Sequence, residues 1–115
     1  MRIKSTPGVF VRMPIATGQT IVAGKAVAGL NGEAVLADKD SEYEVIGLAK
    51  EISAGKVYIQ VQGKFPSTQT GNEFWIGTNG DLVNTVPTTG IVQKVATRID
   101  NQNILIDVDK TVILL

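Results

Sequence analysis

Residues 30–35 read LNGEAV and residues 78–83 read TNGDLV, so the turn-forming pair Asn-Gly occurs twice. In both stretches an acidic residue and then an apolar segment follow the pair. Asn and Gly tolerate the positive φ angles of a type I′ turn, and an Asn-Gly pair between apolar runs predicts a two-residue β-hairpin. The two stretches therefore predict two hairpins with the same turn chemistry.

The residues around these turns also match when the sequence is shifted against itself by 47 positions. Gly24 falls on Gly71, and one inserted residue brings the two Asn-Gly pairs into register. The same shift places Val57, Ile59 and Val61 on Ile104, Ile106 and Val108. We therefore predict an internal duplication with repeats over 17–65 and 66–115. Two copies are too few for a stacked array, so we expect two halves that close on each other.

The strands expected in each half follow from alternating apolar residues, which are typical of a strand with one buried face. Segment 45–53 has partly helical spacing, but it is short and contains Gly47, so a strand is predicted there as well. We expect one all-β domain over 1–115, with 1–16 as an N-terminal arm and first strand. Its architecture is a compact β-barrel or sandwich of about ten short strands. The expected strands cover 8–15, 25–30, 33–38, 45–52, 57–63, 73–78, 81–86, 91–99, 103–109 and 111–115.

Composition narrows the function classes. The 115 residues include 11 basic and 11 acidic side chains, so there is no broad positive field and no nucleic-acid partner is expected. His and Cys are both absent, which removes the commonest general base, the commonest zinc ligands and the thiolate nucleophile. No apolar run is long enough for a spanning helix, and the N-terminus lacks the apolar stretch of a secretory signal. We expect a protein made without export and with no membrane partner.

Two patterns of carboxylates are candidates for a catalytic or a metal-binding site. Asp107 and Asp109 share one face of a strand, as a pair of acids in a hydrolase does, but the same alternation buries Ile106 and Val108. We interpret the pair as the solvated side of that strand.

The second pattern begins at Asp38, where acids alternate as in a calcium loop. Tyr43 and Ala49 then stand where that loop needs Gly and Glu, so an acidic turn is predicted. The glycines near the hairpin turns lack the Gly-Lys-Ser/Thr sequence and following helix of a phosphate loop. We predict no catalytic residues, no metal site and no cofactor, and hence no enzyme.

Binding residues are expected from aromatic side chains and from charge asymmetry. Phe74 and Trp75 are adjacent, so one should point into the core and the other outward, with the choice left open. The first 20 residues are basic without an acid, whereas residues 33–44 hold five acids and one Lys. This asymmetry allows the arm of one copy to dock on the acidic loop of a neighbour, and both segments are equally interpretable as ordinary solvated charges.

Four segments, GQTIVAGKAVAG (18–29), VIGLAKEISAGKVYIQVQGKF (45–65), TGNEFWIGTNGDLV (70–83) and TTGIVQKVATRI (88–99), carry a resemblance that covers nearly the whole chain. They resemble small all-β virion proteins of tailed bacteriophages, in particular capsid decoration (cement) proteins and related β-modules. The resemblance implies a non-enzymatic protein made in the host cytoplasm. It also implies that the protein binds the capsid exterior as a homodimer or homotrimer and clamps subunits of the major capsid (coat) protein.

On this interpretation the two chain ends make the contacts. The arm is expected to order on the coat or on a sister subunit, and the apolar C-terminal tail to pack in the oligomer or at the end of the barrel. The alternative is a trimeric β-module of a phage head fibre or tail appendage that binds a host receptor or glycan through exposed aromatics and the turn 100–103. The predicted partner-binding residues are Arg2, Ile3, Lys4, Val9, Phe10, Arg12, Trp75, Ile113, Leu114 and Leu115.

Overall fold

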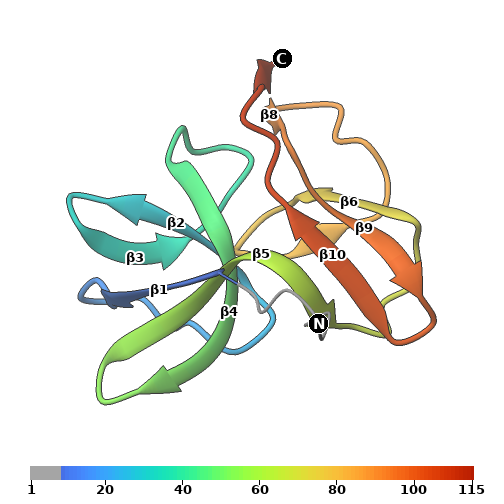
Figure 1. Ribbon diagram of the computed structural model, residues 1–115. Helices are drawn as coiled ribbons and strands as arrows, with labels where there is room; N and C mark the ends of the chain where they lie inside the picture. Colours follow the sequence, from blue (N-terminus) through green and yellow to red (C-terminus); the bar gives the residue numbers. More distant parts are fainter. Residues whose placement is uncertain (1–8) are drawn as a thin grey trace.

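The computed structural model describes residues 9–115, and this part of the chain contains strands and no helix (Figure 1). The prediction of an all-β fold is confirmed, and segment 45–53 is a strand as predicted. No segment of the described chain is therefore a helix that could cross a membrane. The strands are β1 (Val9–Pro14), β2 (Ala26–Leu30), β3 (Glu33–Leu36), β4 (Glu44–Ser53), β5 (Lys56–Pro66), β6 (Glu73–Ile76), β7 (Leu82–Val83), β8 (Ile91–Val92), β9 (Lys94–Asp100), β10 (Asn103–Asp107) and β11 (Ile113–Leu114).

The strand expected over 91–99 is divided at Gln93 into β8 and β9. The Gln93 side chain is buried, and its Nε2 donates a hydrogen bond of 2.8 Å to the backbone oxygen of Asp109. A buried amide needs such a partner. On either side of Gln93, β8 pairs with β11 and β9 pairs with β10 and β6, so the division lies between two sheets, which strand periodicity does not reveal.

Nine strands form one curled sheet, and both halves of the chain contribute the same strand order to it. From the ends toward the middle, each half supplies a hairpin (β3–β2 or β7–β6), a third strand (β4 or β9) and a central strand (β5 or β10). Figure 1 shows β5 running between the two halves. Every pairing between these strands is antiparallel. The predicted construction from two similar halves agrees with this order.

Both Asn-Gly pairs form the predicted turn. The φ angles are 54° and 80° at Asn31 and Gly32, and 53° and 77° at Asn79 and Gly80. Positive φ at both central residues defines type I′. The local turn chemistry is therefore the same in the two halves.

The second turn also fastens the two ends of the sheet together. Gly80 donates its N–H to the backbone oxygen of Ala37 at 2.6 Å, and its own oxygen accepts from the N–H of Ala26 at 2.7 Å. A Cβ atom at Gly80 would lie 2.8 Å from the Leu36 side chain, so this close approach also favours glycine. The hairpin of the second half thus docks on the hairpin of the first and closes the curl.

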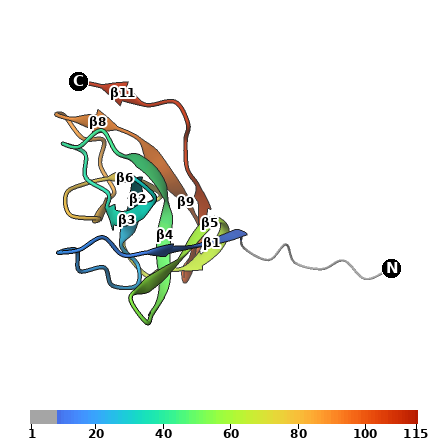
Figure 2. The ribbon, with the colours of Figure 1, turned by 90° about the vertical axis from the view of Figure 1, so that its left-hand side faces the viewer.

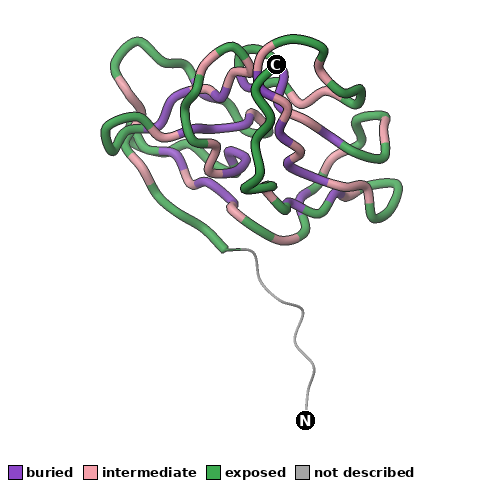
Figure 3. Tube along the Cα trace, turned by 90° about the horizontal axis from the view of Figure 1, so that it is seen from above, coloured by how far each residue is buried: buried purple, intermediate pink, exposed green. Residues whose placement is uncertain are grey.

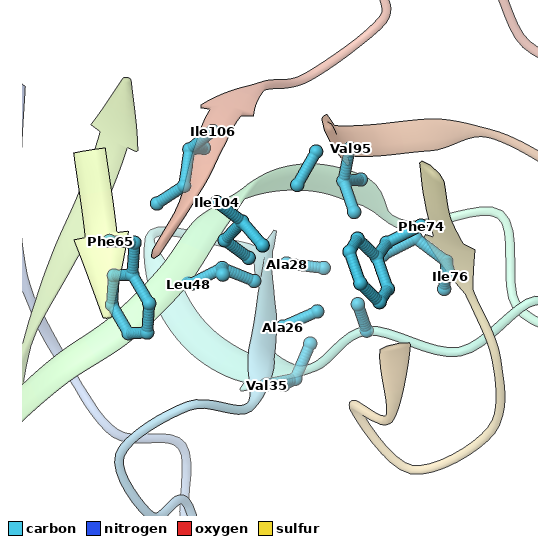
Figure 4. Packing of buried hydrophobic residues seen from close by; sticks show 12 residues of the cluster. Ala26, Ala28, Val35, Leu48, Phe65, Phe74, Ile76, Val95, Ile104 and Ile106 are labelled. Carbon is cyan, nitrogen blue, oxygen red and sulfur yellow. The ribbon is translucent and has the colours of Figure 1, made fainter. Parts of the chain in front are cut away.

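Both halves contribute to the larger of two hydrophobic clusters (Figure 4). Ile104 and Ile106 are fully buried in it, as their alternation predicts, whereas Val108 packs against the cluster and is only partly buried. The cluster consists of Ala26, Ala28, Val35, Ala37, Leu48 and Phe65 from the first half and Phe74, Ile76, Val95, Ala96, Ile104 and Ile106 from the second.

The register of β5 with β10 explains why Val108 is less buried than Ile104 and Ile106. The last pair of that ladder is Gln62 with Asp107, so Val61 and Val108 come next. These two residues are equivalent under the 47-residue shift, which places a local twofold axis of the repeat between them. A symmetric continuation of β10 would pair with 56–60 of β5, but that stretch pairs with β1. The tail therefore leaves the sheet, and β11 pairs with β8 in a separate two-stranded sheet (Figure 2).

Arg98 of β9 holds the connection between β5 and β6. Its Nε donates to the backbone oxygen of Gly71 at 3.0 Å, its Nη1 to that of Ser67 at 2.8 Å, and its Nη2 to that of Gln69. The guanidinium also lies 5.6 Å from the ring centre of Phe74. One side chain thus satisfies several loop carbonyls and fixes the link between the halves.

Candidate functional site

Among the predicted N-terminal contact residues, Arg2, Ile3 and Lys4 lie outside the described residues. Val9 and Phe10 lie on β1 and are 49% and 47% exposed. Arg12 is also exposed, and its Nη1 donates a hydrogen bond of 3.4 Å to the hydroxyl of Tyr58. β1 therefore carries large apolar side chains that the described chain leaves open to solvent.

The backbone of β1 also has an open edge. Within residues 9–115, β5 is the strand with which β1 pairs, and no strand pairs with its other side. Proteins usually cover, charge or shorten an apolar edge strand, because its free N–H and C=O groups recruit other chains. β1 is consequently a candidate contact strand.

The tail is held by its backbone and exposes its side chains. Ile113 pairs with Val92 and Leu114 with Ile91, and the N–H of Leu115 donates to the oxygen of Gly90 at 2.9 Å. Ile113, Leu114 and Leu115 are nevertheless 55%, 64% and 60% exposed. Figure 3 shows that the chain is exposed both in the segment beside the undescribed residues and at the C-terminus. The tail thus presents an ordered apolar ridge.

β1 and the tail border one groove of about 910 Å³. Val61 and Val108, the residues on either side of the local twofold axis, line it. Val11 from β1 and Val112 and Leu114 from the tail line it too. Its polar lining comprises Glu42, Glu44, Gln62, Gln93, Asp107, Asp109 and Lys110, with Tyr43 among them.

The acids of this groove come from two distant segments, 42–44 and 107–109. All four carboxylates are exposed, and none forms an ion pair with another described residue. Asp109 accepts a hydrogen bond of 2.9 Å from the backbone N–H of Thr111. The interpretation of Asp107 and Asp109 as the solvated side of a strand agrees with their exposure.

Asp38, the first acid of the calcium-like pattern, has a structural role. Its two carboxylate oxygens accept hydrogen bonds from the backbone N–H groups of Asp40 (2.9 Å) and Asn79 (3.1 Å). Asp38 therefore ties the loop after β3 to the second Asn-Gly turn. Residues 9–115 contain no group of three or more acids placed to hold a metal ion.

The orientation of the aromatic pair is now defined. Phe74 is fully buried and Trp75 is half-buried, so Trp75 is the outward residue. On β6, Trp75 pairs with Lys94 of β9 and with Val83 of β7, and it does not line the groove. Of the described residues predicted to bind a partner, Leu114 lines the groove, whereas Trp75 lies on a different strand from the two chain ends.

The turn 100–103, a candidate glycan contact, uses the side chains of Asp100 and Asn103 internally. The Asp100 carboxylate accepts from the N–H of Gln102 at 2.8 Å and from Nδ2 of Asn103 at 3.0 Å. These two hydrogen bonds, the one from Gln102 first, lower the pKa of Asp100 below its usual 3.8.

We expect an NMR titration to give an Asp100 pKa below 3.8, and the change Asn103→Ala to raise it. Because folding lowers this pKa, the carboxylate stabilises the fold above the unfolded-state pKa, and this stabilisation is lost as pH falls through the folded-state value. Chemical shifts of the Asp100 side-chain carboxyl carbon report the midpoint directly. A midpoint at or above 3.8 in the unmodified protein would contradict the hydrogen-bonded turn.

Comparison with known proteins gives no family assignment. No protein-family model matches the sequence. No curated protein matches it either. The fold and the exposed surface at the chain ends are therefore the observations on which a functional proposal rests.

Proposed function

We propose that the protein is a structural virion protein that binds the outer surface of a phage capsid as an oligomer and stabilises contacts between coat subunits. The observation that carries this proposal is the apolar surface of the two chain ends, made by Val9 and Phe10 of β1 and by Ile113, Leu114 and Leu115 of the tail. Each of these side chains is about half exposed or more. Large apolar side chains on an unpaired strand edge and on an exposed tail are candidate protein–protein contacts.

The scaffold suits such a clamp. A curled sheet closed by the second Asn-Gly turn positions β1 and the tail on one body, and backbone hydrogen bonds hold both segments. An oligomer of such units contacts several coat subunits at once, and its sites reinforce one another through effective concentration. The expected partners are the major capsid protein and other copies of this chain.

Cosedimentation with empty capsids built from the coat protein of the same phage tests this proposal. The unmodified protein should pellet with the capsids, and the double change Phe10→Ser and Ile113→Ser should weaken binding by at least about tenfold. Both side chains are exposed, at 47% and 55%, so the circular dichroism spectrum should keep its β-type shape. Val86→Ser is the matched control, because Val86 is 54% exposed but lies in the loop after β7.

Two outcomes would count against the proposal. An unmodified protein that stays in the supernatant at every ratio to capsids would show that it does not bind the capsid. Equal loss of binding in Val86→Ser and in the double variant would show that the chain ends are not the contact surface.

A further inference from the structure

The groove beside β1 combines an apolar floor with an acidic rim. The floor includes Val11, Val61 and Val108, and carboxylates stand on two sides of it, at 42–44 and at 107–109. Lys110 is the one basic residue among the lining residues. A peptide with alternating basic and apolar side chains is the complementary occupant, because its charges meet the rim while its apolar residue meets the floor.

Such a peptide is present in the chain itself. Residues 1–8 read MRIKSTPG, with Arg2 and Lys4 on either side of Ile3 and no acid. In an extended peptide alternate side chains point to opposite sides, so binding in an extended form would place Ile3 opposite Arg2 and Lys4. The whole chain is neutral, with 11 basic and 11 acidic side chains, so this charge asymmetry lies between two parts of one sequence.

The pairing of β1 with β5 reaches the point where the pairing of β5 with β10 begins. Val9 pairs with Gln62 of β5, and from Gln62 onward β5 pairs with β10 instead. Eight residues span at most roughly 27 Å when extended, which is enough to reach a neighbouring molecule. The unpaired edge of β1 provides a second surface for that neighbour to cover.

We propose that the groove seats residues 1–8 of a second copy of this chain, an inference that rests on the oligomer in the proposed function. Reciprocal exchange of the segments gives a closed, symmetric oligomer in which every arm is bound and every groove is filled. Val11 of the floor and Val112 and Leu114 of the tail then contact the arm of the neighbouring copy. Phe10 and Ile113 do not line the groove and stay available for the coat.

Charge reversal on each side of the contact tests the proposal. One variant carries Arg2→Glu and Lys4→Glu, and the other carries Glu44→Lys and Asp107→Lys. Glu44 and Asp107 are exposed and form no ion pair or side-chain hydrogen bond within residues 9–115, so both variants should fold. Analytical ultracentrifugation should show the unmodified protein as an oligomer and each variant with a dissociation constant at least about tenfold higher.

Mixing the two variants separates exchange between copies from docking within one chain. The acidic arm of the first variant fits the basic groove of the second, and the basic arm of the second fits the acidic groove of the first. The mixture should therefore associate where each variant alone does not. The matched control reverses two exposed acids that do not line the groove, Glu33→Lys with Glu51→Lys, and should leave association unchanged.

Three results would overturn the inference: a monomeric unmodified protein, a mixture that stays monomeric, or equal weakening by the control. A mixture that stays monomeric would be the result expected if each arm docked on its own groove. If a monomeric protein still pelleted with capsids, the inference would fail while capsid binding stood. If the protein formed an oligomer by arm exchange but did not pellet with capsids, the proposal of capsid binding would be refuted and the arm exchange would stand.

Discussion

Replacing Gly47 by Ala should destabilise the protein by about 3 kcal/mol. A Cβ atom at this position of β4 would lie 2.1 Å from the backbone oxygen of Gln60 and 3.0 Å from the Cα of Val61. Both are backbone atoms of β5, so no change of side-chain rotamer relieves the contact. Relief requires separation of β4 from β5 in the middle of the first half. Urea unfolding followed by circular dichroism measures the loss as a lower midpoint.

Gly29→Ala is the matched control for this change. Gly29 lies in β2, and a Cβ atom there would meet the end of the Ile46 side chain at 3.0 Å, with the three nearest atoms all in side chains. Because that side chain can rotate, the expected loss is below about 1 kcal/mol. Equal losses for the two variants would show that the close approach of β4 to β5 does not limit the size of residue 47.

The second large effect is expected for Arg98→Met, which should destabilise the protein by about 2–4 kcal/mol. Methionine keeps much of the apolar stem but donates no hydrogen bond to the loop carbonyls of Ser67, Gln69 and Gly71. The same unfolding measurement applies. Amide hydrogen exchange should also accelerate in the connection between β5 and β6, because that loop loses its anchor.

Two further variants separate the role of Arg98 from a general effect of charge. Arg98→Lys should recover only part of the loss, because an ammonium group cannot reproduce the planar fork of donors. Arg12→Met removes an exposed guanidinium that makes one 3.4 Å hydrogen bond to Tyr58, and should cost less than about 1 kcal/mol. Full recovery by lysine, or an equal loss at Arg12, would refute the anchoring role.

Much of the fold could be predicted because it depends on local preferences. The positive φ angles at Asn31–Gly32 and Asn79–Gly80 are properties of those residue types, and they produced the two expected turns. Strict alternation in 103–109 predicted which side of β10 is buried as far as Ile106. The split at Gln93 could not be predicted, since it depends on the pairing of β8 with the distant strand β11.

The candidate site was only partly accessible from the sequence. The two chain ends were expected to bind partners, and the imbalance between a basic arm and an acidic loop is visible in composition alone. Trp75, also expected there, lies on β6 and outside the groove. Arg98 carried no sequence signal, because its role is defined by carbonyl groups that approach it only in the folded chain.

The amino-acid sequence by itself determined most of the strands, the two type I′ turns and the repeat, because φ preference and alternation act over a few residues. Tertiary structure decided where the groove lies. β1 pairs with the stretch of β5 that a symmetric β10 would have used, and this competition directs the tail away from the sheet. Residues 42–44 and 107–109 meet beside that departure point, and no local preference encodes their proximity.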